Sequence, residues 1–288
     1  MTSEKRGILT PVHIAVLGIK KWLSSPRMYV VFLMLAVFEW TLIGDVRAYA
    51  ISIGMSISCW YFPFLFVNNI NCIFYYFALI LMYCNAPYVD EHQLYLMLRS
   101  GRRNWFAGQL LYTVASSVLF FAGMAVLSVV EFIPNVGFSA EWESVLVKLS
   151  QNPAAYGHGL YLNVPFQILQ TYSPWHAFLL CFFINVGVGI LLGLLIFYVN
   201  LWKSRGYGAA AALAWVAVSN TVTQKIGLRR WMVVLAPTSW TNLSLYCERN
   251  SRVSVGFAAT FLLAGIAVLS VLILIRAKKY SIEALEEI

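Results

Sequence analysis

Charged residues are scarce in this sequence. Only 11% of its 288 residues are Asp, Glu, Lys or Arg, whereas a soluble domain usually carries about 25%. Apolar residues make up 60% of the chain, and one globular core cannot bury an excess of this size. The shortage of charge therefore excludes an ordinary soluble domain and predicts that lipid surrounds much of the chain.

Signature motifs of ATP-binding proteins, zinc enzymes and disulfide scaffolds are also missing. The sequence has no G-x-x-x-x-G-K-[ST] phosphate loop, no H-E-x-x-H motif and no C-x-x-C pair. Four of its five cysteines lie in or beside apolar runs, where a free thiol packs as a small hydrophobic group. We therefore expect no catalytic residue, no metal site and no cofactor bound by this chain.

Basic residues exceed acidic ones, and the formal net charge is +8. Such a balance occurs in nucleic-acid-binding proteins, but here no basic segment with interleaved aromatic residues stands clear of the apolar runs. In membrane proteins, Lys and Arg gather in cytoplasmic loops. We therefore expect contact with a lipid bilayer and no nucleic-acid partner.

Six apolar runs approach the length of about 20 residues that a helix needs to cross a bilayer. They cover residues 28–44, 60–84, 105–130, 175–202, 206–223 and 253–275. The fifth run is rich in Ala and less apolar than the others. The sequence thus predicts an all-α membrane protein with six transmembrane helices in residues 28–280 and a cytoplasmic tail at residues 281–288.

The distribution of Lys and Arg orients these spans. If the N-terminus lies in the cytoplasm, the inner segments hold most of the 20 basic residues. Because positive charge favours the cytoplasmic side, we predict a multi-pass protein of the plasma membrane with both termini inside.

The N-terminal segment has an amphipathic pattern. From Pro11 onward, apolar residues recur on one helical face and Lys20 and Lys21 lie outside it, although Ile14 interrupts the pattern. We predict a cytoplasmic amphipathic lead over residues 1–27 that lies on the inner membrane surface.

The segment before the last span is irregular. Residues 223–252 combine basic charge with a short apolar run that ends at Pro237. This run is too short to cross a bilayer. We predict a re-entrant or interfacial segment on the outer side, surrounded by protein or water.

Polar side chains inside the apolar runs are candidates for a substrate path: Glu39, Asn68, Asn69 and Asn71. A charge at membrane depth costs at least about 2.5 kcal/mol, so Glu39 should face protein or water. The alternative for Glu39 is a place near the outer end of its span, beside Asp45 and Arg47. The alternative for the Asn residues is hydrogen bonding between helices.

The inner loop between the second and third spans begins with acids, continues with apolar residues and ends with Arg. One interpretation is anchoring by positive charge, with Trp105 at the interface. The other is a short helix that docks a soluble partner at the membrane edge. For this coupling role we single out Asp90, Glu91, Leu94, Met97, Leu98, Arg99 and Arg102.

The order of these features along the chain is informative. A basic amphipathic lead ends in Ser25-Pro26-Arg27, and the acid-rich inner loop ends in Leu98-Arg-Ser-Gly-Arg-Arg-Asn-Trp105. A large outer loop and a broken outer segment follow. This order resembles the permease subunit of type-2 ABC exporters over nearly the whole chain, in architecture more than in signature motifs. The Gly that usually follows the acids of the inner loop is replaced by Gln93-Leu94.

The resemblance implies a permease dimer, formed with a second copy or a paralogue, and separate ABC ATPase subunits that hold ATP and Mg²⁺. Closure of the ATPase pair would move the inner-loop helices and export an amphipathic or hydrophobic substrate from a bacterial cell. Two other classes stay open. A secondary transporter would favour more intramembrane charge, and a membrane-embedded enzyme needs a clustered nucleophile and base or a metal.

Overall fold

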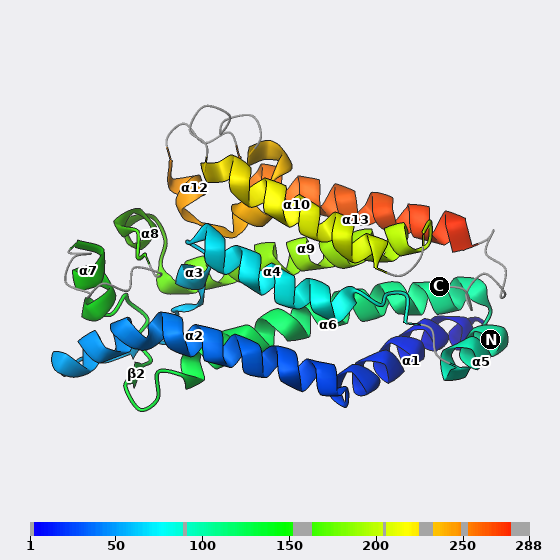
Figure 1. Ribbon diagram of the computed structural model, residues 1–288, viewed down its shortest axis with the longest axis horizontal. Coiled ribbons are helices and arrows are strands. Elements are labelled where there is room, and N and C mark those ends of the chain that lie inside the picture. The colour runs from blue at the N-terminus through cyan, green and yellow to red at the C-terminus, as the bar shows by residue number, and fades with distance from the viewer. Residues whose placement is uncertain are drawn as a thin grey trace.

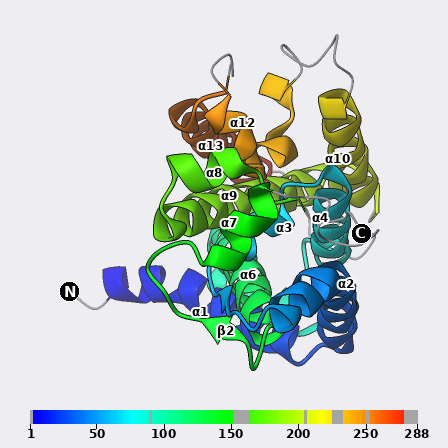
Figure 2. The same ribbon diagram turned by 90° about the vertical axis from the view of Figure 1, so that its left-hand side faces the viewer.

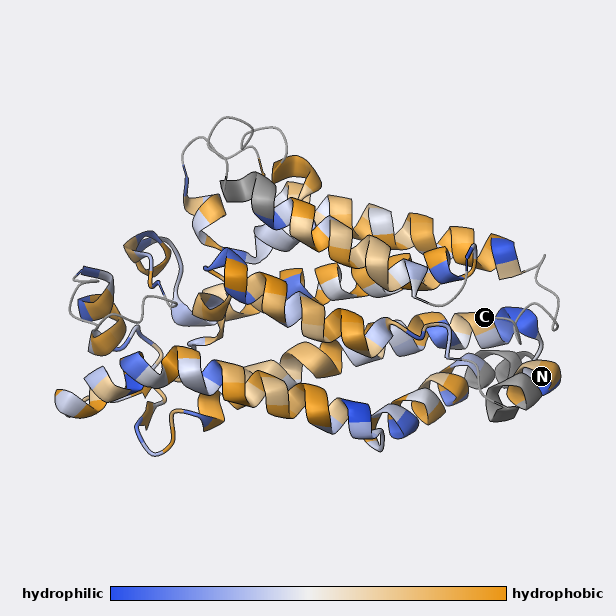
Figure 3. Cartoon of the chain, viewed as in Figure 1, coloured by the Kyte–Doolittle hydropathy of each residue, from blue (hydrophilic) through white to orange (hydrophobic). Residues whose placement is uncertain are grey.

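The computed structural model describes residues 3–88, 91–151, 163–203, 206–224, 233–248 and 253–277. Within these ranges, four helices are long and apolar enough to cross a membrane: α2 (Pro26–Ser52), α6 (Arg102–Val130), α9 (Pro174–Asn200) and α13 (Val255–Ala277). They run along the longest axis of the molecule, and most of their middle residues are hydrophobic (Figure 1, Figure 3). The predicted class, an all-α multi-pass membrane protein, is therefore confirmed.

Helix α9 is the centre of the bundle. In its most apolar stretch 67% of the residues are buried, against 17% in α13. Gly193 allows α9 to pack closely against α6, because a Cβ at this position would lie 2.7 Å from Thr113 of α6. Seen from the end of the bundle, α4 (Asn69–Tyr83), α6, α10 (Tyr207–Gln224) and α13 surround α9 (Figure 2).

The second predicted span is divided in the structure. Helix α3 (Phe62–Leu65) has Pro63 in its first turn, and a short break separates it from α4. Asn68 Oδ1 accepts a hydrogen bond from the Ile70 N–H at 2.9 Å, which caps α4. With 15 residues, α4 rises about 22 Å, less than the ~30 Å of bilayer hydrocarbon. Helix α4 is thus too short to cross a bilayer by itself.

Helix α1 (Ser3–Leu23) lies along the first part of α6 (Figure 1). The two backbones approach closely at Gly108, where a Cβ would lie 2.8 Å from the Cβ of Ile14 and 3.0 Å from the Pro11 carbonyl oxygen. Ile14, which interrupts the predicted apolar face, is therefore buried against α6, whereas Val12 is exposed. Helix α1 therefore packs on α6 through a face that includes Ile14 and leaves Val12 and Val16 exposed.

Short elements gather at one end of the bundle (Figure 1, left). The strands β1 (Ile57–Ser58) and β2 (Val136–Gly137) pair in parallel there. Helices α7 (Ser144–Gln151) and α8 (Phe166–Thr171) lie at the same end. We refer to this end as the outer end, in line with the predicted orientation.

The segment predicted to be re-entrant contains two 3-10 helices, η2 (Val233–Leu235) and η3 (Pro237–Thr241), and helix α12 (Ser244–Cys247). Every residue of η3 is buried. The backbone of η3 is therefore surrounded by protein, whereas Leu235 of η2 is exposed.

The opposite, inner end holds α5 (Glu91–Ser100), the start of α1 and the end of α13 (Figure 1). Gly101 alone separates α5 from α6, and its φ is +83°. This left-handed conformation favours glycine. The chain thus carries a short helix at the inner tip of the bundle, directly before the long helix α6.

Candidate functional site

The coupling residues singled out in the sequence belong to α5 and its flanks. Asp90 lies outside the described residues, as do the side chains of Glu91 and Leu94, whose backbone belongs to α5. Met97 is buried, whereas the next residue, Leu98, is 64% exposed. Helix α5 therefore buries one apolar side chain and presents another to its surroundings.

Arginine side chains accompany the exposed leucine. Arg99 and Arg102 are both exposed. Arg102 and Arg103 also line a groove of 350 Å³ together with Leu274 and Ile275 from the end of α13. The inner tip thus combines an exposed apolar side chain with guanidinium groups, and such a surface suits a protein partner that carries acidic residues.

Backbone hydrogen bonds connect α5 directly with α6. The Gly101 N–H donates to the Met97 carbonyl oxygen at 2.9 Å, and the Trp105 N–H donates to the Gly101 carbonyl oxygen at 3.1 Å. The backbone groups of the turn are therefore paired on both sides of the glycine. A displacement of α5 is expected to move the first turns of α6 with it.

The segment that leads from α4 to α5 is held by Asn200 at the end of α9. The Asn200 side-chain nitrogen donates to the carbonyl oxygens of Cys84 at 3.2 Å and Ala86 at 2.6 Å. Its side-chain oxygen accepts from the Gly208 N–H at 2.8 Å. One buried amide thus joins α9, the exit of α4 and the start of α10. Asn200 was not singled out in the sequence analysis. It could have been found as a polar residue inside the apolar run of residues 175–202.

Glu39 lies in the middle of α2 with 0% of its surface exposed. Its carboxyl oxygens make no hydrogen bond with any residue that the structure describes. The carboxyl lies within electrostatic range of Glu131, the first residue after α6, and of Tyr75 on α4. The buried side chain of Glu39 therefore faces protein.

Two polar groups near Glu39 also lack hydrogen-bond partners among the described residues: the Tyr75 hydroxyl and the Glu131 carboxyl. Burial raises the pKa of Glu131 to about 7, although the nearby Arg47 guanidinium lowers it. We name Glu39, Tyr75 and Glu131 the outer polar cluster. Buried carboxyl groups without partners are suited to bind and release a proton.

The three Asn residues of the predicted path take different places. Asn68 caps α4, and Asn69 is half-buried beside it at the helix start. Asn71 is buried and lies one turn before Tyr75 on the same helix face. Of the three, Asn71 is thus the one that shares a helix face with a member of the outer polar cluster.

A second buried network joins η3 to the bundle. The Tyr76 hydroxyl donates to Asn185 Oδ1 at 2.9 Å, and Asn185 Nδ2 donates to the Cys181 carbonyl oxygen at 2.9 Å. The Cys181 thiol contacts the Thr241 carbonyl oxygen of η3 at 3.7 Å. Because these polar groups have partners, this network holds α4, α9 and η3 together, in contrast to the outer polar cluster.

Comparisons with known proteins give no further identification. No protein-family model, curated protein or solved structure matches the chain. The function proposed for the protein is therefore inferred from its own residues and their arrangement.

Proposed function

We propose that this protein is the permease subunit of an ATP-driven exporter in a bacterial plasma membrane. In this proposal the chain crosses the membrane six times and has both termini in the cytoplasm. Separate ABC ATPase subunits bind ATP and Mg²⁺, and a second permease copy or paralogue completes the transporter. The substrate is amphipathic or hydrophobic.

Four of the six proposed crossings are the long helices α2, α6, α9 and α13. We assign the fifth to α3 together with α4, and the sixth to α10. Both α3 and α4 pack against α9, so together they continue one path through the bundle. Helix α10 has 18 residues and rises about 27 Å, close to the ~30 Å of bilayer hydrocarbon. An even number of crossings agrees with the start of α1 and the end of α13 lying at the same end (Figure 1).

The observation that carries this proposal is the place of α5. This helix lies at the inner tip, between α4 and α6, and exposes Leu98 beside Arg99. On one side its backbone continues into α6 through Gly101, and on the other side Asn200 holds the segment that precedes it. A partner that docks on α5 is therefore connected mechanically to the long helices.

A separate ATPase is required because the sequence has no phosphate-binding loop. The outer polar cluster lies where α2, α4 and the end of α6 meet, and we assign it to the substrate path. Polar groups without partners at such a depth mark a route for a substrate or an ion in membrane proteins.

Purification from the native membrane in a mild detergent tests the proposal. Mass spectrometry is expected to find an ATPase subunit with a phosphate loop in a fixed ratio to this chain. Leu98→Ala and Arg99→Glu should leave membrane insertion intact and reduce transport-coupled ATP hydrolysis by about tenfold, the loss of about 1.4 kcal/mol of coupling energy.

The control variant is Phe138→Ala, which removes an exposed aromatic side chain at the outer end. It should leave coupled hydrolysis unchanged. If the α5 variants hydrolysed ATP and transported substrate as well as the unmodified protein, the coupling role of α5 would be wrong.

A proton-driven secondary transporter is the second candidate, because Glu39 is buried without a hydrogen-bond partner among the described residues. The two candidates differ in their energy source. A protonophore should stop a secondary transporter at constant ATP concentration, whereas depletion of ATP at constant proton gradient should stop the exporter proposed above.

A further inference from the structure

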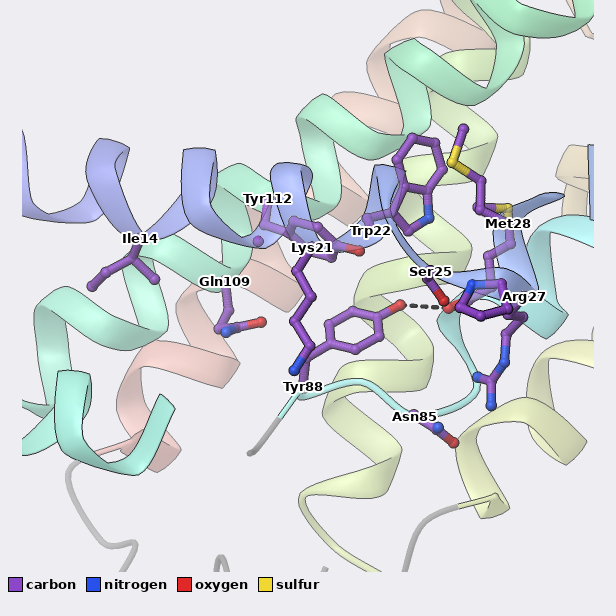
Figure 4. Close-up of a pocket in the computed structure, with 13 residues that line it drawn as sticks. Ile14, Lys21, Trp22, Ser25, Arg27, Met28, Asn85, Tyr88, Gln109 and Tyr112 are labelled. Carbon is purple, nitrogen blue, oxygen red and sulfur yellow. Dashed lines mark hydrogen bonds between the residues drawn. The ribbon is translucent and has the colours of Figure 1, made fainter. Parts of the chain in front are cut away.

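A cavity of 370 Å³ lies at the elbow between α1 and α2 (Figure 4). Its wall comes from α1, the start of α2, the end of α4 with the segment after it, and the first turns of α6. The nitrogen-bearing side chains of its lining are Lys21, Trp22, Arg27, Asn85 and Gln109. The volume falls in the range of about 300–1,000 Å³ that is usual for small-molecule sites.

The charge of the lining favours an anion. None of the described residues that line the cavity is acidic, whereas Lys21 and Arg27 supply two cations. Arg27 Nη1 donates to the Cys84 sulfur at 3.4 Å, and a thiol is too weak an acceptor to compensate a guanidinium charge. Figure 4 shows the side chains of Lys21 and Arg27 extending in the same direction.

Trp22 supplies independent evidence for a ligand. Its side chain is 8% exposed, and its Nε1–H finds no acceptor in the part of the chain that the structure describes. Leaving a buried donor unpaired is unfavourable. In Figure 4 the indole nitrogen lies on the ring edge that faces Ser25 and the other lining residues. An oxygen of a bound anion would satisfy this donor.

The position of the cavity points to a lipid. Helix α1 ends at Leu23 and α2 begins at Pro26, so the elbow lies at the start of the candidate span α2, which is its cytoplasmic end in the predicted topology. Such a turn lies at the level of the lipid headgroups. The lining also contains the apolar side chains of Met28 and Met82, which suit the upper part of an acyl chain.

We propose that this cavity binds the phosphate headgroup of an anionic phospholipid. Lys21 and Arg27 compensate the phosphate charge, and the Trp22 indole donates a hydrogen bond to a phosphate oxygen. The cytoplasmic leaflet is rich in anionic lipids, and basic sites between helices on that side bind their headgroups. The bound lipid fastens α1 to α2, α4 and α6. Lipid binding at this cavity does not require an ATPase. The lipid site can therefore be disproved without disproving the exporter function, and the reverse also holds.

Native mass spectrometry of the delipidated full chain, titrated with phosphatidylglycerol or phosphatidylcholine, tests the proposal. Phosphatidylglycerol is expected to bind in a one-to-one adduct, and phosphatidylcholine is not. Trp22→Phe and Arg27→Gln should each weaken phosphatidylglycerol binding about tenfold, the usual effect of losing a hydrogen bond to a charged group. Lys20→Gln removes an exposed charge beside the cavity, outside its lining, and should bind as the unmodified chain does.

Equal phosphatidylglycerol binding by all variants would overturn the proposal, because the lipid would then be bound nonspecifically around the protein. Displacement of the lipid by inorganic phosphate at equal concentration would assign the cavity to a free anion and would also overturn it. Trp22→Phe keeps the aromatic ring, and an unchanged size-exclusion profile shows that it folds. Arg27→Gln changes an exposed side chain and gives the same test if Trp22→Phe fails to fold.

Discussion

The side-chain amide of Asn200 donates a hydrogen bond of 2.6 Å to the carbonyl oxygen of Ala86. Through this bond the end of the central helix α9 holds the segment that leads from α4 into α5. A displacement of α5, such as the proposed ATPase would cause, is therefore expected to act on α9 as well as on α6. The bond places a buried amide at the connection between the inner tip and the bundle.

Replacing Asn200 with Ala should destabilise the protein strongly. The substitution removes the partner of three backbone groups, those of Cys84, Ala86 and Gly208. A buried polar group left unpaired costs about 1–3 kcal/mol, so we expect a loss of at least about 2 kcal/mol in thermal unfolding in detergent. Asn104→Ala is the control, since that side chain donates to the Ser100 carbonyl oxygen one turn earlier in the chain. Equal losses in both variants would contradict the role of Asn200.

Two tyrosines of α4 should respond in opposite ways to loss of the hydroxyl. The Tyr83 hydroxyl lies 2.8 Å from Ser116 Oγ and 2.9 Å from Ser117 Oγ. Tyr83→Phe should therefore cost about 0.6–1.7 kcal/mol. The Tyr75 hydroxyl has no partner among the described residues, so Tyr75→Phe should be neutral or stabilising. Thermal unfolding of the two variants compares them directly, and a larger loss in Tyr75→Phe would refute the assignment.

The stability of the protein should decrease as pH rises, because of Glu131. Burial raises the pKa of this carboxyl from 4.5 to about 7. Between these values the folded protein holds a proton that the unfolded chain releases, so unfolding becomes more favourable as pH increases through this window. In the unmodified protein, Glu131 should lower the free energy of unfolding by about 2 kcal/mol between about pH 5 and about pH 8. In Glu131→Gln this decrease should be absent.

Melting temperatures of Glu131→Gln and the unmodified protein at both pH values measure the effect. Glu141→Gln, which changes an exposed carboxyl of the outer loop, should keep the pH dependence of the unmodified protein. A dependence that survives in Glu131→Gln would show that another group causes it.

Two glycines should differ in their tolerance of a methyl group. A Cβ at Gly208 would collide with the Ile196 carbonyl oxygen and lie 2.7 Å from Asn200 Oδ1. Gly208→Ala should therefore separate α10 from α9 and cost about 1–3 kcal/mol. A Cβ at Gly44, within α2, would meet nothing within 4 Å, and Gly44→Ala should gain up to about 1 kcal/mol. Similar unfolding temperatures for the two variants would disprove this packing of α10 on α9.

Local signals predicted much of the fold. Apolar runs of sufficient length predicted the long helices, and Pro26 and Pro174 stand in the first turns of α2 and α9, where proline is favoured. The irregular segment around Pro237 was also recognisable. These features depend on neighbouring residues in the chain, which is why the sequence shows them.

Features that depend on contacts between distant helices could not be predicted. The burial of Ile14 depends on the close approach of Gly108. That Glu39 faces protein depends on how α2 is rotated against its neighbouring helices. The cavity at Trp22 combines four separate elements, and no spacing along the chain indicates it.

Site-specific photo-crosslinking from position 98 tests the central claim most directly. A photoreactive amino acid replaces Leu98, which is 64% exposed on α5, and a matched variant carries it in place of Phe138 at the outer end. The account predicts that irradiation of native membranes joins position 98, and not position 138, to an ATPase subunit with a phosphate loop. Crosslinks from position 98 to lipid alone, or equal crosslinking from both positions, would contradict it.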